Sequence, residues 1–167
     1  IMSIVGQIEI NDDFKKALRL LEESQKSIFI TGKAGTGKST LLSYWLNNSK
    51  KIAAVVAPTG VAALNIGGVT IHSFFGFHPG ITLNEAEKAG QQKAKKDVYR
   101  KLDCLVIDEI SMVRADLLDC VDVFLKRSRN NHLPFGGLRM VFFGDLYQLS
   151  PVVTASEAKA LSQIYDS

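Results

Sequence analysis

The chain has 167 residues, of which 46% are hydrophobic and 22% are charged, and its formal net charge is +3. These values are ordinary for one globular domain with a sizeable core, and the weak positive charge permits nucleic-acid binding without arguing for it. No apolar run approaches the roughly 18 residues that a membrane span requires, and no secretory signal is visible. We therefore expect an intracellular protein without a membrane partner, cytoplasmic in a bacterium and nuclear or mitochondrial in a eukaryote.

Predicted strands and helices alternate along the chain. Asn11 can cap a first helix, and a strand over residues 27–31 then leads through a glycine-rich loop into a helix that ends near residue 48. Further strands are predicted at residues 51–57, 102–107 and 138–143, with helices at 61–64, 91–101, 114–127 and 156–164. Residues 76–90 lack a periodic pattern, so a surface loop is predicted there. The alternation predicts an α/β fold with a parallel sheet, helices on both faces and ligands at the carboxyl ends of the strands.

The glycine-rich loop, residues 32–40, has the spacing G-x-x-x-x-G-K-[ST] of a phosphate-binding loop. Gly35 and Gly37 permit positive φ, so backbone N–H groups can converge on one anion, and the start of the following helix adds its dipole. We expect Lys38 to reach the β- and γ-phosphates and the Ser39 hydroxyl to bind Mg²⁺. The alternative is a glycine-rich turn with an unrelated lysine. The predicted nucleotide-binding residues are Gly32, Ala34, Gly35, Thr36, Gly37, Lys38, Ser39 and Thr40.

Two adjacent carboxylates, Asp108 and Glu109, follow the apolar strand at 102–107. In the predicted sheet this strand end lies beside the phosphate loop. Asp108 would hold Mg²⁺ directly or through water, and Glu109 would orient or deprotonate an attacking water. Neighbouring residues on a strand point in different directions, so each carboxylate can take one role. Without the loop, the same pair would be read as a solvated turn.

A third strand end, after residue 143, carries Gly144, Asp145 and Gln148. Gln148 could hydrogen-bond the γ-phosphate or the attacking water, which would make it a relay between nucleotide state and conformation. The alternative is a surface glutamine in a turn. Asp145 fits a structural role and a site role equally well. The candidate catalytic residues are therefore Lys38, Asp108, Glu109 and Gln148.

A fourth segment, residues 57–74, is rich in small hydroxyl residues and glycines around a predicted helix start, which suits contacts to a nucleic-acid backbone. His72, Phe74 or Phe75 could stack on unpaired bases. The alternative is that the aromatic pair belongs to the core and that His72 is a structural group. The residues alone leave both interpretations open.

Taken together, these segments resemble the first four motifs of superfamily 1B helicases, and most closely the Pif-type (petite integration frequency) DNA helicases. The resemblance is carried by residues 32–40, 57–75, 105–113 and 142–152, and by a segment at 116–137 that is similar to a signature of the family. It implies a RecA-like phosphate-loop NTPase domain that uses ATP and Mg²⁺ and moves 5′-to-3′ on single-stranded DNA. The positions matching its DNA-binding motif are Thr59, Gly60, Thr70, His72 and Phe74.

The chain departs from the family pattern at one position of interest. The family often carries a glutamine that reads adenine, and Phe14 stands there in this chain. The resemblance therefore does not imply adenine selectivity.

The resemblance also implies two RecA-like domains with the nucleotide between them. We expect residues 1–167 to form the N-terminal one, with the second domain of the same protein as a partner that supplies arginines to the phosphates. By itself this domain is expected to bind the Mg²⁺-nucleotide weakly, to hydrolyse it poorly and not to unwind DNA. Two alternatives remain at this point: a RecD or relaxase-type helicase, against which residues 116–137 argue, and a nucleotide-dependent binding switch without translocation.

Overall fold

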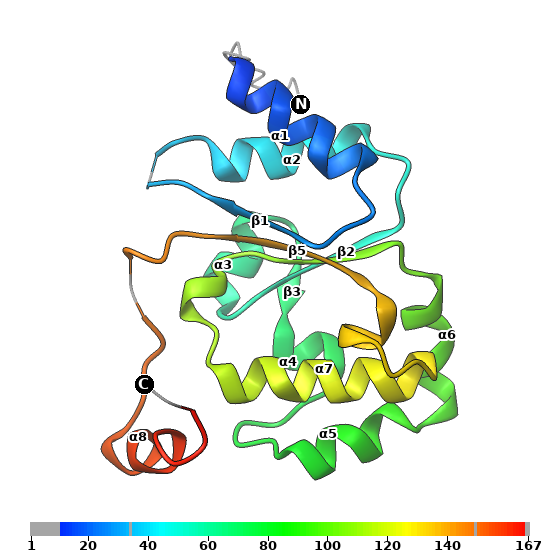
Figure 1. Cartoon of the computed structure of the whole chain (residues 1–167), viewed down its shortest axis with the longest axis vertical. Coiled ribbons are helices and arrows are strands. Elements are labelled where there is room, and N and C mark those ends of the chain that lie inside the picture. Colours follow the sequence, from blue (N-terminus) through cyan, green and yellow to red (C-terminus); the bar gives the residue numbers. More distant parts are fainter. Residues whose placement is uncertain (1–10, 34, 149, 166–167) are drawn as a thin grey trace.

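The computed structural model describes residues 11–33, 35–148 and 150–165, and within them it has a five-stranded sheet in the order β1-β5-β4-β2-β3. The strands are β1 (Ile28–Thr31), β2 (Ala53–Ala57), β3 (Val69–Thr70), β4 (Cys104–Ile107) and β5 (Arg139–Gly144). All four neighbouring pairs are parallel. Their carboxyl ends therefore share one edge, on the left in Figure 1. The parallel sheet predicted from the alternation of elements is confirmed.

Helices cover both faces of the sheet (Figure 1). One face carries α1 (Asp12–Glu23) and α2 (Lys38–Asn48); the other carries α4 (Ile71–Phe75), α5 (Leu83–Gly90), α6 (Lys93–Lys101), α7 (Ala115–Arg129) and the 3₁₀ helix η2 (Pro134–Gly137). Side chains of β4 alternate between the two cores: Val106 packs under α1 and α2, and Ile107 packs with the α7 side. All four residues of β4 are buried, which explains the continuous apolar run in the sequence.

The segment at 76–90 was predicted as a loop, and this prediction is wrong because residues 83–90 form α5. Thr82 and Glu85 make a reciprocal capping box that starts the helix. The buried residues of α5 are small, Ala86 and Gly90, and a Cβ at Gly90 would lie 2.6 Å from the Phe124 carbonyl oxygen of α7. The apolar face of α5 is short and its core-facing residues, Ala86 and Ala89, are small, so its helical spacing gives a weaker signal than a stripe of large apolar residues.

The two ends of α1 are fixed to their surroundings. At its start, Asn11 accepts a hydrogen bond from the Phe14 N–H at 2.8 Å. At its end, the buried guanidinium of Arg139 in β5 donates to the carbonyl oxygens of Leu20, Leu21 and Lys26 at 2.8–3.1 Å. The Leu21 carbonyl is among the last four of α1, which a helix leaves without an internal partner, whereas the Leu20 carbonyl also accepts from the Ser24 N–H and Lys26 follows the helix. The bonds from Arg139 hold α1 in place beside the strand that precedes the phosphate loop.

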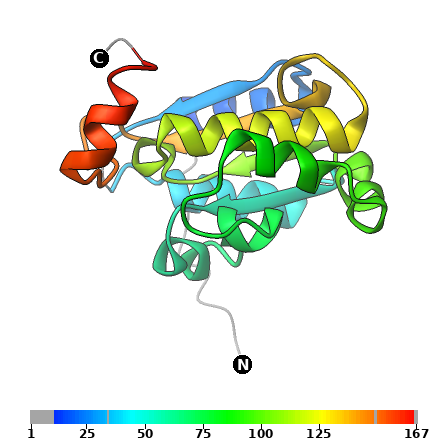
Figure 2. The same cartoon turned by 90° about the horizontal axis from the view of Figure 1, so that it is seen from below.

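The remaining elements lie at the carboxyl edge of the sheet: α3 (Gly60–Asn65), the 3₁₀ helix η1 (Ile110–Met112) and α8 (Ala155–Leu161). Figures 1 and 2 both place α8 beyond this edge, beside the start of α7. None of the described helices is both long and apolar enough to cross a bilayer.

Candidate active site

The phosphate loop joins the end of β1 to the start of α2. Gly35 and Gly37 have φ values of 76° and 87°, as the sequence predicted, and Gly37 directly precedes the first helical residue. A Cβ at Gly32 would lie 2.7 Å from the Thr36 Oγ1 atom, so the close turn of the loop requires glycine at its start. Ala34, also predicted to bind the nucleotide, lies outside the described residues.

Lys38 lies in the first turn of α2 and turns back over the loop. Its ammonium donates to the carbonyl oxygens of Gly32 at 2.5 Å and Lys33 at 3.1 Å. The Thr36 hydroxyl donates to the same Lys33 oxygen at 2.8 Å, which closes the loop from the other side. Ser39 and Thr40 are exposed in the same helical turn. A positive charge thus lies inside a loop that opens on a helix N-terminus, the arrangement that favours a polyphosphate.

The carboxylates at the end of β4 differ in environment. Asp108 is only 7% exposed, and this burial raises the pKa of its carboxyl, against a smaller lowering by a hydrogen bond from the Glu109 backbone. Glu109 is half-exposed and adopts the left-handed region, with φ 52° and ψ 44°. For a residue with a side chain this conformation costs roughly 1–2 kcal/mol. The backbone therefore turns sharply between the two carboxylates, and their different surroundings suit different roles.

Gly144 at the end of β5 supports this turn. A Cβ there would lie 2.8 Å from the Ile110 Cγ2 atom and 3.3 Å from the Ile110 backbone nitrogen. Only glycine therefore lets η1, which begins at Ile110 directly after Glu109, pack against the end of β5. The position of Glu109 depends on this contact.

Gln148 lies at the end of a tight turn after β5. Asp145 is buried, and its carboxylate accepts from the Tyr147 N–H at 3.0 Å, while its backbone oxygen accepts from the Gln148 N–H at 3.0 Å. Gln148 itself is exposed. Of the two roles that the sequence left open for Asp145, these contacts favour the structural one, since they shape the turn that presents Gln148.

Two cavities meet at the phosphate loop. One of about 370 Å³ contains residues from the loop, from the end of β4 and from the turn after β5: Gly35, Gly37, Lys38, Ser39, Thr40, Asp108, Glu109 and Gln148. β4 is not the sheet neighbour of β1, because β5 lies between them. The predicted catalytic residues nevertheless line one cavity, since the shared edge brings the three strand ends together.

The second cavity, of about 950 Å³, lies between the loop and α1. It shares Gly35, Gly37, Lys38 and Thr40 with the first, and its other walls come from α1, β1 and α2. The resemblance pointed to position 14, since Phe14 stands where the family often carries a glutamine that reads adenine, but the other contributions of α1 were not identified from the sequence. The lining residues from α1 and its cap are Asn11, Asp13, Phe14 and Ala17.

The predicted DNA-binding residues line neither cavity. The hydroxyls of Thr59 and Thr70 cap α3 and α4, where they accept backbone N–H groups at 3.2 and 3.1 Å. Gly60 is exposed and His72 is half-buried. The half-buried ring of Phe74 makes edge contacts, at centroid distances of 5.0 Å to Phe75 and 5.4 Å to Tyr99. Phe75 is a core residue, whereas the other positions retain exposed surface beside the carboxyl edge.

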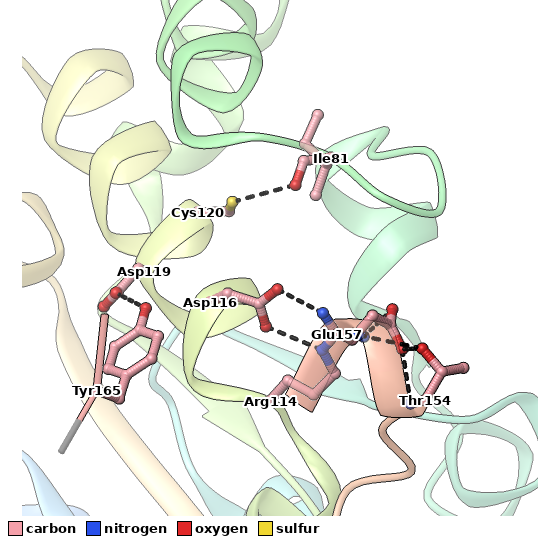
Figure 3. A network of polar contacts seen from close by, with 8 residues as sticks. All are labelled: Ile81, Arg114, Asp116, Asp119, Cys120, Thr154, Glu157 and Tyr165. Carbon is pink, nitrogen blue, oxygen red and sulfur yellow. Dashed lines mark hydrogen bonds and ion pairs between the residues drawn. The ribbon is translucent and has the colours of Figure 1, made fainter. Parts of the chain in front are cut away.

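An ion-pair network that the sequence did not suggest ties α8 to the start of α7 (Figure 3). The Arg114 guanidinium donates to both carboxylate oxygens of Asp116 at 3.0 and 2.7 Å, and to Glu157 of α8 at 2.5 Å. The Tyr165 hydroxyl donates to Asp119 one turn further along α7. The chain segments that follow Glu109 and Gln148 are thereby joined to each other.

This network predicts a pH effect on α8. The hydrogen bond from Arg114 and those from Thr154 lower the pKa of Glu157 from 4.5 to about 2. Because the folded-state pKa is depressed, the stabilisation is complete above 4.5 and is lost as pH falls through about 2. In Arg114→Gln we expect the Glu157 pKa to rise toward 4.5, measured by a carboxyl ¹³C NMR titration. Arg127→Gln, which removes a similar pairing with Glu87 elsewhere on α7, is the matched control. A Glu157 pKa that stays at about 2 without Arg114 contradicts the assignment.

A parallel α/β sheet with a phosphate loop after β1 and an acidic pair after β4 defines a RecA-like domain of the phosphate-loop class. The model of the PIF1-like helicase family matches residues 9–167. The chain therefore belongs to the PIF1-like helicase family, which confirms the resemblance stated from the motifs and favours it over the RecD and relaxase types.

Comparison with individual proteins gives the same family. The chain is 45% identical over 141 residues to the ATP-dependent DNA helicase PIF1 of Saccharomyces cerevisiae, covering 79% of this chain and 16% of the yeast protein. It is 39% identical over 153 residues to Pif1 of Bdellovibrio bacteriovorus, covering 89% of this chain and 34% of that protein. The crystal structure of Bacteroides Pif1 helicase in complex with ADP-AlF3 and single-stranded DNA superposes with a TM-score of 0.87 at 42% identity, over 96% of this chain and 38% of that one. The chain thus spans a minor part of each relative.

Proposed function

We propose that this chain is the N-terminal ATP-binding motor domain of an ATP-dependent DNA helicase that moves 5′-to-3′ on single-stranded DNA. The observation that carries the proposal is the smaller cavity, where the phosphate loop meets Asp108, Glu109 and Gln148. Membership of the PIF1-like family supports it, since relatives of that name are ATP-dependent DNA helicases. The proposed DNA track implies an intracellular location.

The residues of the smaller cavity fit a nucleotide with a divalent cation. Mg²⁺ in nucleotide sites takes one or two protein oxygens in addition to phosphate oxygens and water, and among the oxygens that line this cavity the Ser39 hydroxyl and the Asp108 carboxylate are the proposed ligands. The raised pKa of Asp108 reflects a buried carboxylate that a cation would stabilise in its charged form. When bound, Mg²⁺ neutralises charge that develops on the phosphate oxygens.

Lys38, Glu109 and Gln148 have different roles in the proposed hydrolysis. Phosphate oxygens compete with the Gly32 and Lys33 carbonyls for the Lys38 ammonium, which then faces the β- and γ-phosphates. Glu109, half-exposed at its turn, orients the attacking water and accepts its proton. Gln148, held by the Asp145 turn, hydrogen-bonds the γ-phosphate or the water and moves when the phosphate leaves.

We propose that single-stranded DNA lies along the carboxyl edge near α3 and α4, where Thr59, Gly60, Thr70, His72 and Phe74 are the candidate contacts. In support, a Bacteroides relative has been crystallised with single-stranded DNA. The two threonine hydroxyls already cap helices, so their contribution would be to present the N-terminal N–H groups of α3 and α4 to backbone phosphates. A second RecA-like domain, proposed as the partner, would complete the track and supply arginines.

The proposal is tested with the 167-residue chain, labelled ATP and a fluorescent oligothymidylate. We expect ATP binding that weakens when Mg²⁺ is chelated, slow hydrolysis, and oligothymidylate binding that falls with added salt, as phosphate contacts require. Absence of oligothymidylate binding at low salt, if it persists in a longer chain that includes the second domain, would favour a nucleotide-dependent switch over a helicase. Rapid DNA-stimulated hydrolysis by these residues alone would refute the need for a second domain.

A further inference from the structure

The larger cavity faces the nucleoside end of the proposed ligand. Asp108, Glu109 and Gln148 line only the smaller cavity, so the γ-phosphate belongs there. The shared loop residues would hold the chain of phosphates, which leaves the larger cavity for the ribose and the base. Its volume of about 950 Å³ is ample for both. This step rests on the proposed function.

The apolar wall of that cavity centres on Phe14. Its ring is half-buried and packs edge-on against Tyr44 of α2, with ring centroids 5.9 Å apart and an interplanar angle of 72°. Its backbone N–H is fixed by the Asn11 cap. The other apolar lining residues are Ala17, Ile30 and Leu41. An aromatic wall binds a base by stacking and contact area, and because every base has a π face, such contacts do not read base identity.

The polar side chains that line the larger cavity also do little to distinguish one base from another. Strong selection between bases arises when the wrong base leaves a buried polar group of the site unpaired. Among the described lining residues, the polar side chains other than Lys38 are exposed to water, and the Asn11 amide oxygen already accepts from Phe14. A mismatched base would leave these groups hydrated, at little cost. The exposed polar lining residues are Asn11, Asp13, Thr31, Thr36 and Thr40.

We propose that this site accepts purine nucleoside triphosphates without selecting adenine, so that GTP is a substrate alongside ATP, and that Phe14 is the residue that determines this breadth. The phosphates provide the affinity through the loop and Lys38. Phe14 provides a surface on which adenine and guanine pack equally well.

The test measures displacement of a fluorescent nucleotide from the 167-residue chain by ATP and by GTP, with Mg²⁺ present. For the unaltered chain we expect the two affinities to agree within about fivefold. In Phe14→Gln the new amide can donate to N7 of adenine and accept from its N6, whereas guanine offers the acceptor O6 in place of N6 and allows only one of these two bonds, so the ratio should shift toward ATP by about tenfold. Phe14→Leu, which keeps apolar bulk and loses the π face, should weaken both nucleotides equally.

Matched variants separate this inference from the proposed function. Leu20→Gln places the same new amide on an exposed position of α1 that does not line the cavity, and it should leave the ratio unchanged. Circular dichroism confirms that each variant is folded. ATP binding with GTP weaker by more than about fivefold overturns the inference alone. An unshifted ratio in Phe14→Gln overturns the role of Phe14, and failure of the unaltered chain to bind either triphosphate overturns the proposed function together with the inference.

Discussion

Substitution of Lys38 by alanine is expected to abolish nucleotide binding while leaving the fold intact. The ammonium lies within the loop, bonded to the carbonyl oxygens of Gly32 and Lys33, and no other described lysine or arginine lines either cavity. Charge-assisted hydrogen bonds to two phosphates together contribute about 3 kcal/mol or more, which corresponds to a loss of at least about 100-fold in affinity. Isothermal titration with the Mg²⁺-nucleotide measures this directly.

Lys33 provides the control for that experiment. It lies in the same loop and carries the same charge, but its side chain is exposed and does not line the cavities. Lys33→Ala removes the long-range attraction alone, so we expect a loss of no more than about threefold, diminishing at higher salt. Equal losses in the two variants would show that net charge, and not the position of Lys38, governs binding.

Glu109→Gln is expected to preserve nucleotide affinity and to slow hydrolysis by about 10²–10⁴-fold. The amide has the size of the carboxylate and can hold a water molecule, but it cannot accept the proton that the water must lose. Single-turnover hydrolysis with radiolabelled ATP is the suitable measurement, because it separates the chemical step from binding and release.

Glu87→Gln is the matched control for this substitution, because it removes a carboxylate that pairs with Arg127 between α5 and α7. It should leave the rate unchanged. A Glu109→Gln rate close to that of the unaltered chain would remove Glu109 from the catalytic assignment and leave water activation to another group.

The phosphate loop and the acidic pair could be predicted because their chemistry is local in sequence. Positive φ at Gly35 and Gly37 follows from residue type, and the strand before Asp108 is apolar because both its faces are covered. That they line one cavity follows from the parallel sheet, since all strand ends meet at one edge. The prediction that the loop and the acidic pair lie close together did not require the order of the strands in the sheet.

Other features could not be predicted because they depend on contacts distant in sequence. The helix α5 is a different case, because its Thr82–Glu85 capping box is local in sequence and could have been identified there, whereas the close approach of Gly90 to α7 could not. The wall formed by Phe14 depends on where Arg139 anchors α1, more than a hundred residues away. The pairing of Arg114 with Glu157 joins two surface charges that, in sequence, are indistinguishable from solvated ones.

The left-handed backbone at Glu109 has a consequence for engineering. A residue with a side chain is strained at φ 52°, and glycine or asparagine would relieve that strain. A redesign that ranks substitutions by thermal stability alone would therefore favour replacing Glu109, and the variant that it selects would melt higher while losing the proposed proton acceptor. Stabilisation of this domain for crystallography or biotechnology is better sought at positions distant from the strand ends, where stability and turnover are not in conflict.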